Sequence, residues 1–330
     1  LENDTWKNKD QWSSLAKDVR LLNIMKIGII GNGGHSKRIQ RILKKNKINF
    51  HIYKPKKPKY FNSNEYEKLK NCDTIFIVSP NKTHLKYLKK LKNNRYIFCE
   101  KPPVTSLNEL ESLKKISHKK IYFNFNYRFS KIAEILKNTQ KYKLEDLLYA
   151  NLIVAHGLAL KKNYIKNWRS NRIKCRKGVY EIISVHFIDL INFYYNINKI
   201  NKPKLINHSG VGTSFDTSHV ELNLKNKSIV NIFSSYNSPY ANKLFFLFKN
   251  GIVEQQDNKI TIKGPAINID SKGFFKSPKT IRQFIIDDKK DYEESLKKSV
   301  TYFLTCAKKK INFSKRLFIK SLETNEILLK

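Results

Sequence analysis

The chain has 330 residues, 40% of them hydrophobic and 12% aromatic, which is enough to bury two cores and excludes intrinsic disorder as its main state. No run approaches 18 consecutive apolar residues and the first residues are polar, so we predict neither a membrane span nor a secretory signal, and by default a cytoplasmic location. The four cysteines are scattered without a C-x-x-C pair, so neither a disulfide framework nor a metal site is predicted.

The formal net charge is +38, from 65 basic and 27 acidic residues. A basic surface of this kind attracts the phosphates of nucleic acids. Only ten of the basic residues are arginines, whereas readers of nucleic-acid bases favour the planar arginine fork. A nucleic-acid partner is therefore not expected, although the charge would attract anionic small molecules.

The first half of the chain alternates between short apolar runs and helical stretches. Residues 1–24 precede Met25, the only methionine, and are interpreted as an N-terminal extension. Strands are predicted at 26–30, 49–53, 74–78, 95–99 and 121–124, and helices at 36–45, 82–92 and 106–117. Ser106 and Glu109 have the spacing of a capping box at the start of the last helix. Apolar strands that alternate with helices predict a doubly wound parallel sheet of the Rossmann type over residues 25–142.

The second half has longer strand-like segments. Strands are predicted at 147–155, 204–215, 219–224, 228–235 and 243–249, with helices at 182–195 and 287–310. Residues 221–224 and 229–232 alternate in polarity around a short polar connection, which predicts a hairpin. Residues 143–330 are therefore predicted to form an α+β domain for substrate binding and oligomerisation. Its open-faced antiparallel sheet would have helices on one face.

A glycine-rich turn between the first strand and the first helix is the first candidate site. Glycine lets the backbone turn tightly and lets a diphosphate approach the amides at a helix N-terminus. The alternative is a purely structural turn. The candidate cofactor-binding residues here are Gly31, Asn32, Gly33, Gly34, His35 and Ser36, with Ser36 in the place of the usual third glycine.

The end of the second strand bears on the choice of cofactor. An NAD site normally has an acidic residue there for the ribose 2′-hydroxyl, but no acid appears before Glu65. Lys54 would suit a 2′-phosphate, so NADP is predicted, with NAD as the alternative. Lys54 could also be part of a solvated lysine run that continues to Lys59.

Polar residues also follow the third and fourth strands, at the edge where open α/β sheets bind ligands. The candidates after the third strand are Ser79, Pro80, Asn81 and His84, and those after the fourth are Glu100 and Lys101. His84 could instead cap the helix that follows.

The order of these motifs resembles the Gfo/Idh/MocA family of glucose-fructose oxidoreductases and inositol dehydrogenases. The resemblance rests on the glycine turn, P-N-x-x-H, E-K-P, N-Y-R-F at 126–129, Trp168-Arg169 and a His186-x-x-Asp189 block, and it spans about residues 25–330. It implies a nucleotide-binding domain joined to a sheet domain. It also implies NAD(P)-dependent oxidation or reduction of a sugar, cyclitol or nucleotide sugar, for instance a precursor of surface polysaccharide.

The resemblance also implies roles for individual residues. Lys101 and His186 match the active-site lysine and histidine of the family, and Asn126 lies in the segment that closes the cofactor domain. A lysine can stabilise developing alkoxide charge, and a histidine can take or return a proton. The residues expected to bind substrate are Lys101, Arg128, Trp168, Arg169 and His186, although Trp168 could be simple core.

One departure from the family pattern concerns the proton relay. The family commonly has an acid four residues before the histidine, where this chain has Ile182. Glu181 lies about 140° from His186 on a regular helix, so it can replace that acid only where the backbone is irregular. Asp189 lies about 60° from His186 and could orient the imidazole instead. A catalytically weakened sensor or partner subunit is the alternative function, and a polyanion-binding protein is a third.

Apolar residues on the outer face of the second sheet predict self-association. Phe233, Phe245 and Leu247 would lie on the face that helices leave uncovered, so a homodimer or homotetramer is expected.

Overall fold

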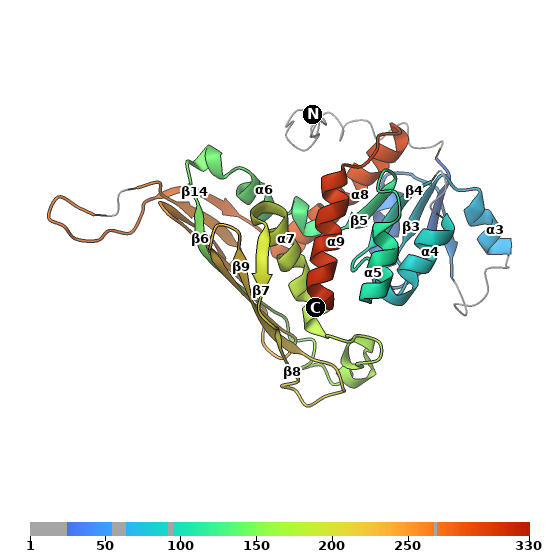
Figure 1. Cartoon of the computed structure of the whole chain (residues 1–330), viewed down its shortest axis with the longest axis horizontal. Helices are drawn as coiled ribbons and strands as arrows, with labels where there is room; N and C mark the ends of the chain where they lie inside the picture. Colours follow the sequence, from blue (N-terminus) through green and yellow to red (C-terminus); the bar gives the residue numbers. More distant parts are fainter. Residues whose placement is uncertain (1–24, 55–63, 92–94, 267–268) are drawn as a thin grey trace. The chain divides into compact units, whose positions relative to one another are not determined.

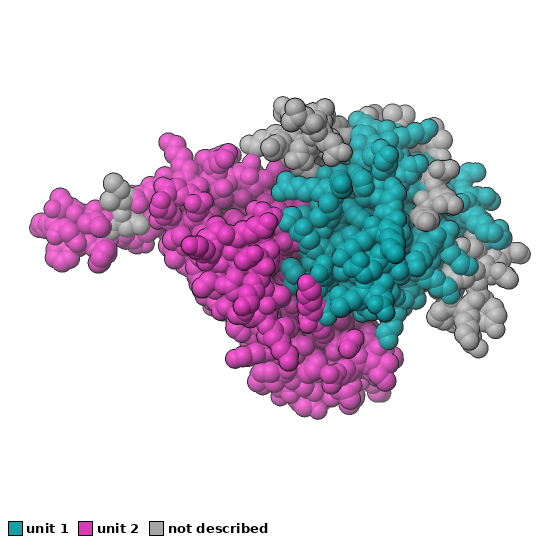
Figure 2. Space-filling model, in the orientation of Figure 1, with its two compact units in different colours: residues 1–126, 295–329 teal, residues 127–294, 330 magenta. Residues whose placement is uncertain are grey.

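The computed structural model describes residues 25–54, 64–91, 95–266 and 269–330, which divide into two compact units (Figure 2). The first unit takes in the chain up to residue 126 and residues 295–329, and the second takes in residues 127–294 and Lys330. The predicted boundary at 142/143 lies inside the second unit, and residues 295–329, predicted in the second domain, belong to the first unit. The predicted extension at residues 1–24 lies outside the described residues.

The first unit is built on a five-stranded parallel sheet with strand order β2-β1-β3-β4-β5 (Figure 1). Its strands are β1 (Ile27–Ile30), β2 (Phe50–Tyr53), β3 (Thr74–Ile77), β4 (Tyr96–Glu100) and β5 (Ile121–Asn124). Its helices are α2 (Gly34–Lys45), α3 (Asn64–Lys70), α4 (His84–Leu91), α5 (Leu107–Lys114), the later part of α8 (Asp288–Lys308) and α9 (Lys315–Leu329). The predicted doubly wound sheet is confirmed. Strand order reverses at β1, which is the position where such sheets bind ligands.

The predicted capping box at α5 is present in modified form. Ser106 is the N-cap, and its Oγ accepts a hydrogen bond from the Glu109 backbone N–H at 3.3 Å. The Glu109 carboxylate reaches one residue further back than expected and accepts from the N–H and hydroxyl of Thr105 at 2.8 and 3.0 Å. Three donors at the start of α5 are thereby satisfied.

The C-terminal helices cover opposite faces of the parallel sheet. Phe303 of α8 lies 6.1 Å from Tyr122 between ring centroids, and Phe318 of α9 lies 5.7 Å from Phe123. Tyr122 and Phe123 are consecutive strand residues, whose side chains point to opposite faces. The helix at 315–329 was not predicted, and it explains why the end of the chain belongs to the first unit.

The second unit is built on a nine-stranded sheet with the order β14-β13-β12-β11-β6-β10-β9-β7, and β8 also pairs with β9. Neighbouring strands are antiparallel except β6 and β10, which are parallel. The strands are β6 (Leu147–Ala155), β7 (Ile197–Ile200), β8 (Lys204–Ile206), β9 (Thr217–Leu224), β10 (Ile229–Ser235), β11 (Ala241–Phe248), β12 (Gly251–Gln256), β13 (Lys259–Lys263) and β14 (Thr280–Ile285). The helices are α6 (Lys131–Lys137) and α7 (Val185–Tyr195), with the first turns of α8. The predicted sheet domain is confirmed as mixed and mostly antiparallel.

The predicted strand at 204–215 is wrong after residue 206. Gly210 and Gly212 have φ values of +65° and +79°, which an extended strand does not allow. The Asp216 carboxylate accepts hydrogen bonds from the backbone N–H groups of His208 and Ser209 at 3.0 and 2.8 Å and thereby holds a turn. The predicted hairpin is confirmed as β9 and β10, with Leu222 opposite Val230.

The two faces of the second sheet differ in burial. Leu222, Ile232 and Phe246 point to one face and are fully buried. Phe233 and Phe245 point to the other face and are only partly buried. Apolar side chains therefore lie on a partly exposed sheet face. Across the described ranges, no helix is both long and apolar enough to cross a membrane.

Candidate functional site

The glycine turn after β1 has the backbone geometry that a dinucleotide requires. Gly31 has a φ of +108°, and a Cβ on this residue would lie 2.3 Å from the Val78 carbonyl oxygen, so only glycine fits. A Cβ on Gly33 or Gly34 would meet no atom within 4 Å, so the backbone faces open space there. Helix α2 begins here without a side-chain cap and without an acid in its first turn. Its N–H groups are therefore available to a diphosphate.

Polar side chains hold the shape of this turn. Ser36 is fully buried, and its hydroxyl donates to the Gly31 carbonyl oxygen at 2.8 Å. The Gln40 amide donates to both the Asn32 side-chain oxygen and the Ser36 hydroxyl at 3.0 Å. Asn32 and Ser36 therefore support the turn through their side chains. Gln40 was not predicted, although it lies one helical turn after Ser36.

Lys54 lies next to the glycine turn. The Gly31 N–H donates to the carbonyl oxygen of Tyr53 at 2.9 Å, and Lys54 is the residue after Tyr53. Its side chain is exposed. The rest of the lysine run, residues 55–59, lies outside the described residues.

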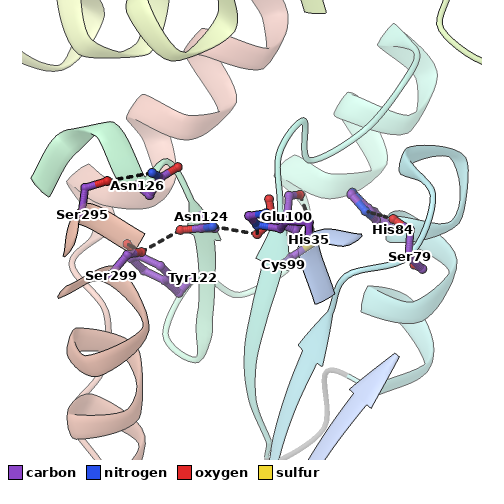
Figure 3. A network of polar contacts seen from close by, with 10 residues as sticks. All are labelled: His35, Ser79, His84, Cys99, Glu100, Tyr122, Asn124, Asn126, Ser295 and Ser299. Atoms are coloured by element: carbon purple, nitrogen blue, oxygen red, sulfur yellow. Dashed lines mark hydrogen bonds and ion pairs between the residues drawn. The ribbon is translucent and has the colours of Figure 1, made fainter. Parts of the chain in front are cut away.

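His84 joins the loops that follow β3 and β4 (Figure 3). It is fully buried, with Nδ1 2.9 Å from the Pro102 carbonyl oxygen and Nε2 3.0 Å from that of Ser79. Burial lowers the pKa of His84, and this effect outweighs the carbonyl contacts and the charge of Glu100, which raise it. The ring is thus used to fix the Lys101-Pro102 loop, a role that the sequence did not suggest. Pro80 is exposed and Asn81 half-buried beside it.

Glu100 is the centre of a polar network at the end of β4 (Figure 3). Its Oε1 lies 2.7 Å from His35 Nε2 and accepts a hydrogen bond from Asn124 Nδ2 at 2.7 Å. Burial alone would raise the pKa of Glu100. The His35 charge and hydrogen bond, the Asn124 hydrogen bond and the Lys101 charge outweigh burial and lower it. Glu100 is therefore an ionised, buried carboxylate beside the half-buried Lys101.

Two serines of α8 bind two asparagines of the first unit (Figure 3). The Ser299 hydroxyl donates to the Asn124 side-chain oxygen at 2.7 Å, and the Asn126 amide donates to the Ser295 hydroxyl at 2.9 Å. All four side chains are buried. Asn126 was a predicted cofactor residue. Its serine partner is 169 positions away, so no local pattern could indicate it.

In the second unit, Arg128 and Asp189 form a buried ion pair. Arg128 Nε donates to Asp189 Oδ2 at 2.8 Å, and Nη2 donates to Oδ1 at 2.6 Å. The guanidinium also lies 4.5 Å from the Phe193 ring centroid. The sequence analysis assigned Arg128 to substrate and Asp189 to the proton relay. The bidentate pair joins the chain after residue 126 to α7, and the roles of Arg128 toward substrate and of Asp189 in the relay remain predictions.

His186, near the start of α7, packs in a tilted arrangement against Tyr127, an aromatic residue that the sequence analysis did not name as a site residue. Its ring centroid lies 4.8 Å from that of Tyr127. Burial is the main cause that raises the pKa of Tyr127, and electrostatic repulsion from the nearby Tyr292 and Tyr240 raises it further. The Tyr127 hydroxyl therefore stays protonated. Tyr127 lies inside the N-Y-R-F motif, which was the available signal for this contact.

The backbone before His186 is irregular. Residues 180–184 form a π-helical turn before α7 begins. Hydrogen bonds in a π-turn join residues five apart, so the 140° separation expected on a regular helix does not apply to Glu181 and His186. Glu181 is half-buried. The pKa of the Cys175 thiol is raised first by the burial of that thiol and then by the charge and hydrogen bond of Glu181. The condition under which Glu181 could serve the relay is therefore met.

Trp168 and Arg169 belong to a cation-aromatic cluster in the second unit. The Arg169 guanidinium lies 4.4 Å from the Trp168 ring centroid, and Trp168 is 38% exposed, so it is not a core residue. Burial lowers the pKa of His156, and the Arg169 charge lowers it further. The His156 and Tyr236 rings lie 4.9 Å apart. These two residues directly follow the parallel strands β6 and β10, a position that could have indicated them.

Comparison with known proteins identifies the first unit. Residues 25–123 match the family described as "Oxidoreductase family, NAD-binding Rossmann fold", which is GFO_IDH_MocA. These residues belong to the Gfo/Idh/MocA family. No curated protein matches the chain.

Several solved structures resemble nearly the whole chain. A dehydrogenase from Clostridium difficile is 19% identical with a TM-score of 0.67, and the match covers 93% of this chain and 98% of that chain. A levoglucosan dehydrogenase in complex with NADH and levoglucosan is 12% identical with a TM-score of 0.71, covering 92% and 95%. A myo-inositol dehydrogenase from Corynebacterium glutamicum is 16% identical with a TM-score of 0.67, covering 92% and 94%. At these identities the likeness establishes the shared fold.

The glycine turn after β1 and the start of α2 fit an organic cofactor. In the described part of the chain, no group of three or more His, Cys, Asp or Glu side chains could hold a metal ion. The open backbone at Gly33 and Gly34 and the uncapped start of α2 fit a cofactor diphosphate.

Proposed function

We propose that the protein is an NAD(P)-dependent oxidoreductase that transfers a hydride to or from a hydroxyl or keto carbon of a sugar, cyclitol or nucleotide sugar. The observation that carries the proposal is the glycine turn with its uncapped helix, beside the Glu100-Lys101 pair at the end of β4. The named activities of the levoglucosan and myo-inositol dehydrogenases support a polyol substrate.

Each candidate side chain has a chemical task in this reaction. A bound nicotinamide cofactor would supply or accept the hydride. Lys101 would stabilise negative charge on the substrate oxygen as it develops. His186 would take the hydroxyl proton in oxidation and return it in reduction, with its ring held by Tyr127. Glu181, in the π-turn, is the candidate acid for relaying that proton.

The cation-aromatic cluster suits a carbohydrate. The exposed Trp168 ring offers an apolar face for a sugar ring, and the Arg169 guanidinium offers several donors for hydroxyl or phosphate oxygens. The half-buried His156 lies beside Arg169 and packs against the fully buried Tyr236. We therefore propose that Trp168 and Arg169 bind substrate.

A hydride-transfer assay tests the proposal. Purified protein, supplied with NAD+, NADP+, NADH or NADPH, is expected to change the absorbance of the nicotinamide with at least one member of a panel of sugars, cyclitols and nucleotide sugars. If the protein binds cofactor but turns over no member of the panel, the sensor or partner-subunit function replaces the enzymatic one. If it binds neither cofactor but binds polyanions with a steep salt dependence, the polyanion function replaces both.

The cofactor preference depends on Lys54. We expect the protein to bind NADPH about tenfold more tightly than NADH, because the Lys54 ammonium beside the glycine turn attracts the 2′-phosphate. Lys54→Asp should narrow or reverse this preference, since it removes an attraction and adds a repulsion. Fluorescence titration with both cofactors measures the ratio. The exposed Lys89→Asp on α4 makes the same charge change elsewhere, and an equal effect of both variants would contradict the prediction.

The partly exposed sheet face supports a homodimer or homotetramer. Phe233, Phe245 and Leu247 alternate with buried residues and point away from the core. Covering them with a second copy would remove apolar surface from water. Light scattering at micromolar concentration is expected to give a dimeric or tetrameric mass. A monomeric mass would be incompatible with this proposal.

A further inference from the structure

We infer that Ser299 and Asn124 are positioning residues for cofactor binding, because they orient Glu100, which in turn fixes His35 at the glycine turn. The inference rests on the proposed function. A continuous chain of hydrogen bonds within the first unit runs from Ser299 of α8 to His35 in the first turn of α2 (Figure 3).

The chain of hydrogen bonds has only one consistent direction. A carboxylate only accepts hydrogen bonds, so both Asn124 Nδ2 and His35 Nε2 must donate to Glu100 Oε1. The Asn124 oxygen therefore faces Ser299, whose single hydroxyl proton is donated to it at 2.7 Å. Ser299 must then accept from the Tyr122 hydroxyl at 2.8 Å. Each group fixes the orientation of the next.

This direction has a consequence for the His35 ring. Because Glu100 accepts from Nε2, the ring carries a proton on Nε2 in either of its charge states. His35 is the second residue of α2, in the turn whose N–H groups face open space. Its pairing with Glu100 also keeps a buried negative charge from standing alone beside a diphosphate site. The position of this carboxylate therefore affects how strongly an anionic cofactor binds.

Two variants interrupt the chain without changing the cofactor-facing residues. Ser299→Ala removes the donor that orients the Asn124 amide. Asn124→Asp keeps the shape but replaces the Glu100 donor with a second carboxylate, so it should have the larger effect. We expect the affinity for NADH or NADPH to fall about tenfold in Ser299→Ala, and Ser299→Thr, which keeps the hydroxyl, to recover most of it. Ser321→Ala is the matched control, because this buried serine of α9 donates to the Leu317 carbonyl oxygen of its own helix at 2.8 Å.

The pH dependence of binding separates positioning from loss of structure. Without an oriented Asn124 donor the pKa of Glu100 should rise. Burial still disfavours the ionised carboxylate, and a hydrogen bond that stabilised the ionised form is lost. The acid limb of the affinity profile should therefore move to higher pH in Ser299→Ala and Asn124→Asp, and stay in place in Ser321→Ala. The charged or titratable groups that act with Glu100 are His35 on α2, Lys101 and Cys99 on or after β4, and His84 on α4.

A second readout needs no cofactor. Nitrogen-15 NMR of the His35 ring, assigned by comparison with His35→Gln, should show the Nε2-protonated form in the wild type and a smaller population of it in Ser299→Ala. Unchanged affinity, pH profile and ring signals in both variants, with normal NADH or NADPH binding by the wild type, would overturn the positioning role and leave the proposed function standing. A wild-type protein that binds neither cofactor would overturn both.

Discussion

Lys101→Met is expected to lower kcat by about 10² to 10³ or more, because the ammonium stabilises charge that appears on the substrate oxygen mainly in the transition state. Cofactor affinity should change little, since the backbone at Gly33 and Gly34 and the start of α2 hold the diphosphate separately. Steady-state hydride transfer measures the first quantity, and NADH or NADPH fluorescence titration measures the second.

The exposed Lys89→Met on α4 is the control for this variant, because it removes the same charge from the same unit. Lys101→Arg retains a positive charge with a different shape and should recover part of the rate if charge is the main contribution. Equal turnover by the wild type and Lys101→Met would rule out the assigned role of this lysine.

Arg128→Leu should destabilise the second unit by about 3–5 kcal/mol, because it leaves the Asp189 carboxylate buried without its bidentate partner. The double variant Arg128→Leu with Asp189→Leu should regain most of this free energy of unfolding, since no charge remains buried. Urea denaturation followed by circular dichroism gives the stability. Hydrogen exchange at residues 185–195 assigns the change to α7.

Arg176→Leu provides the comparison for an exposed arginine of the same unit and should change the free energy of unfolding by less than about 0.5 kcal/mol. If Arg128→Leu were as stable as Arg176→Leu, the pair would contribute nothing to the stability of the second unit.

Much of the first sheet could be predicted because most positions of its strands are apolar. Parallel strands covered on both faces produce continuous apolar runs, and all five predicted strands lie within one residue of β1 to β5 at each end. The second sheet was predicted less completely. Strands β7, β12, β13 and β14 were not recognised, and neither were helices α3, α6 and α9. The run at 204–215 contains two glycines with positive φ, which an extended strand does not allow.

The sequence alone determined the fold class, the glycine turn and the motifs at the carboxyl ends of the strands, because these depend on local spacing and on the backbone freedom of glycine. Only the tertiary structure decided the partners of the polar side chains. His35 and Glu100 are 65 positions apart, Arg128 and Asp189 are 61 apart, and Asn124 and Ser299 are 175 apart. Hydrogen-bond geometry depends on distances of a few tenths of an ångström between such residues. The packing of α8 on the first sheet brings the Ser299 hydroxyl to the Asn124 side chain, and no local sequence pattern predicts this contact.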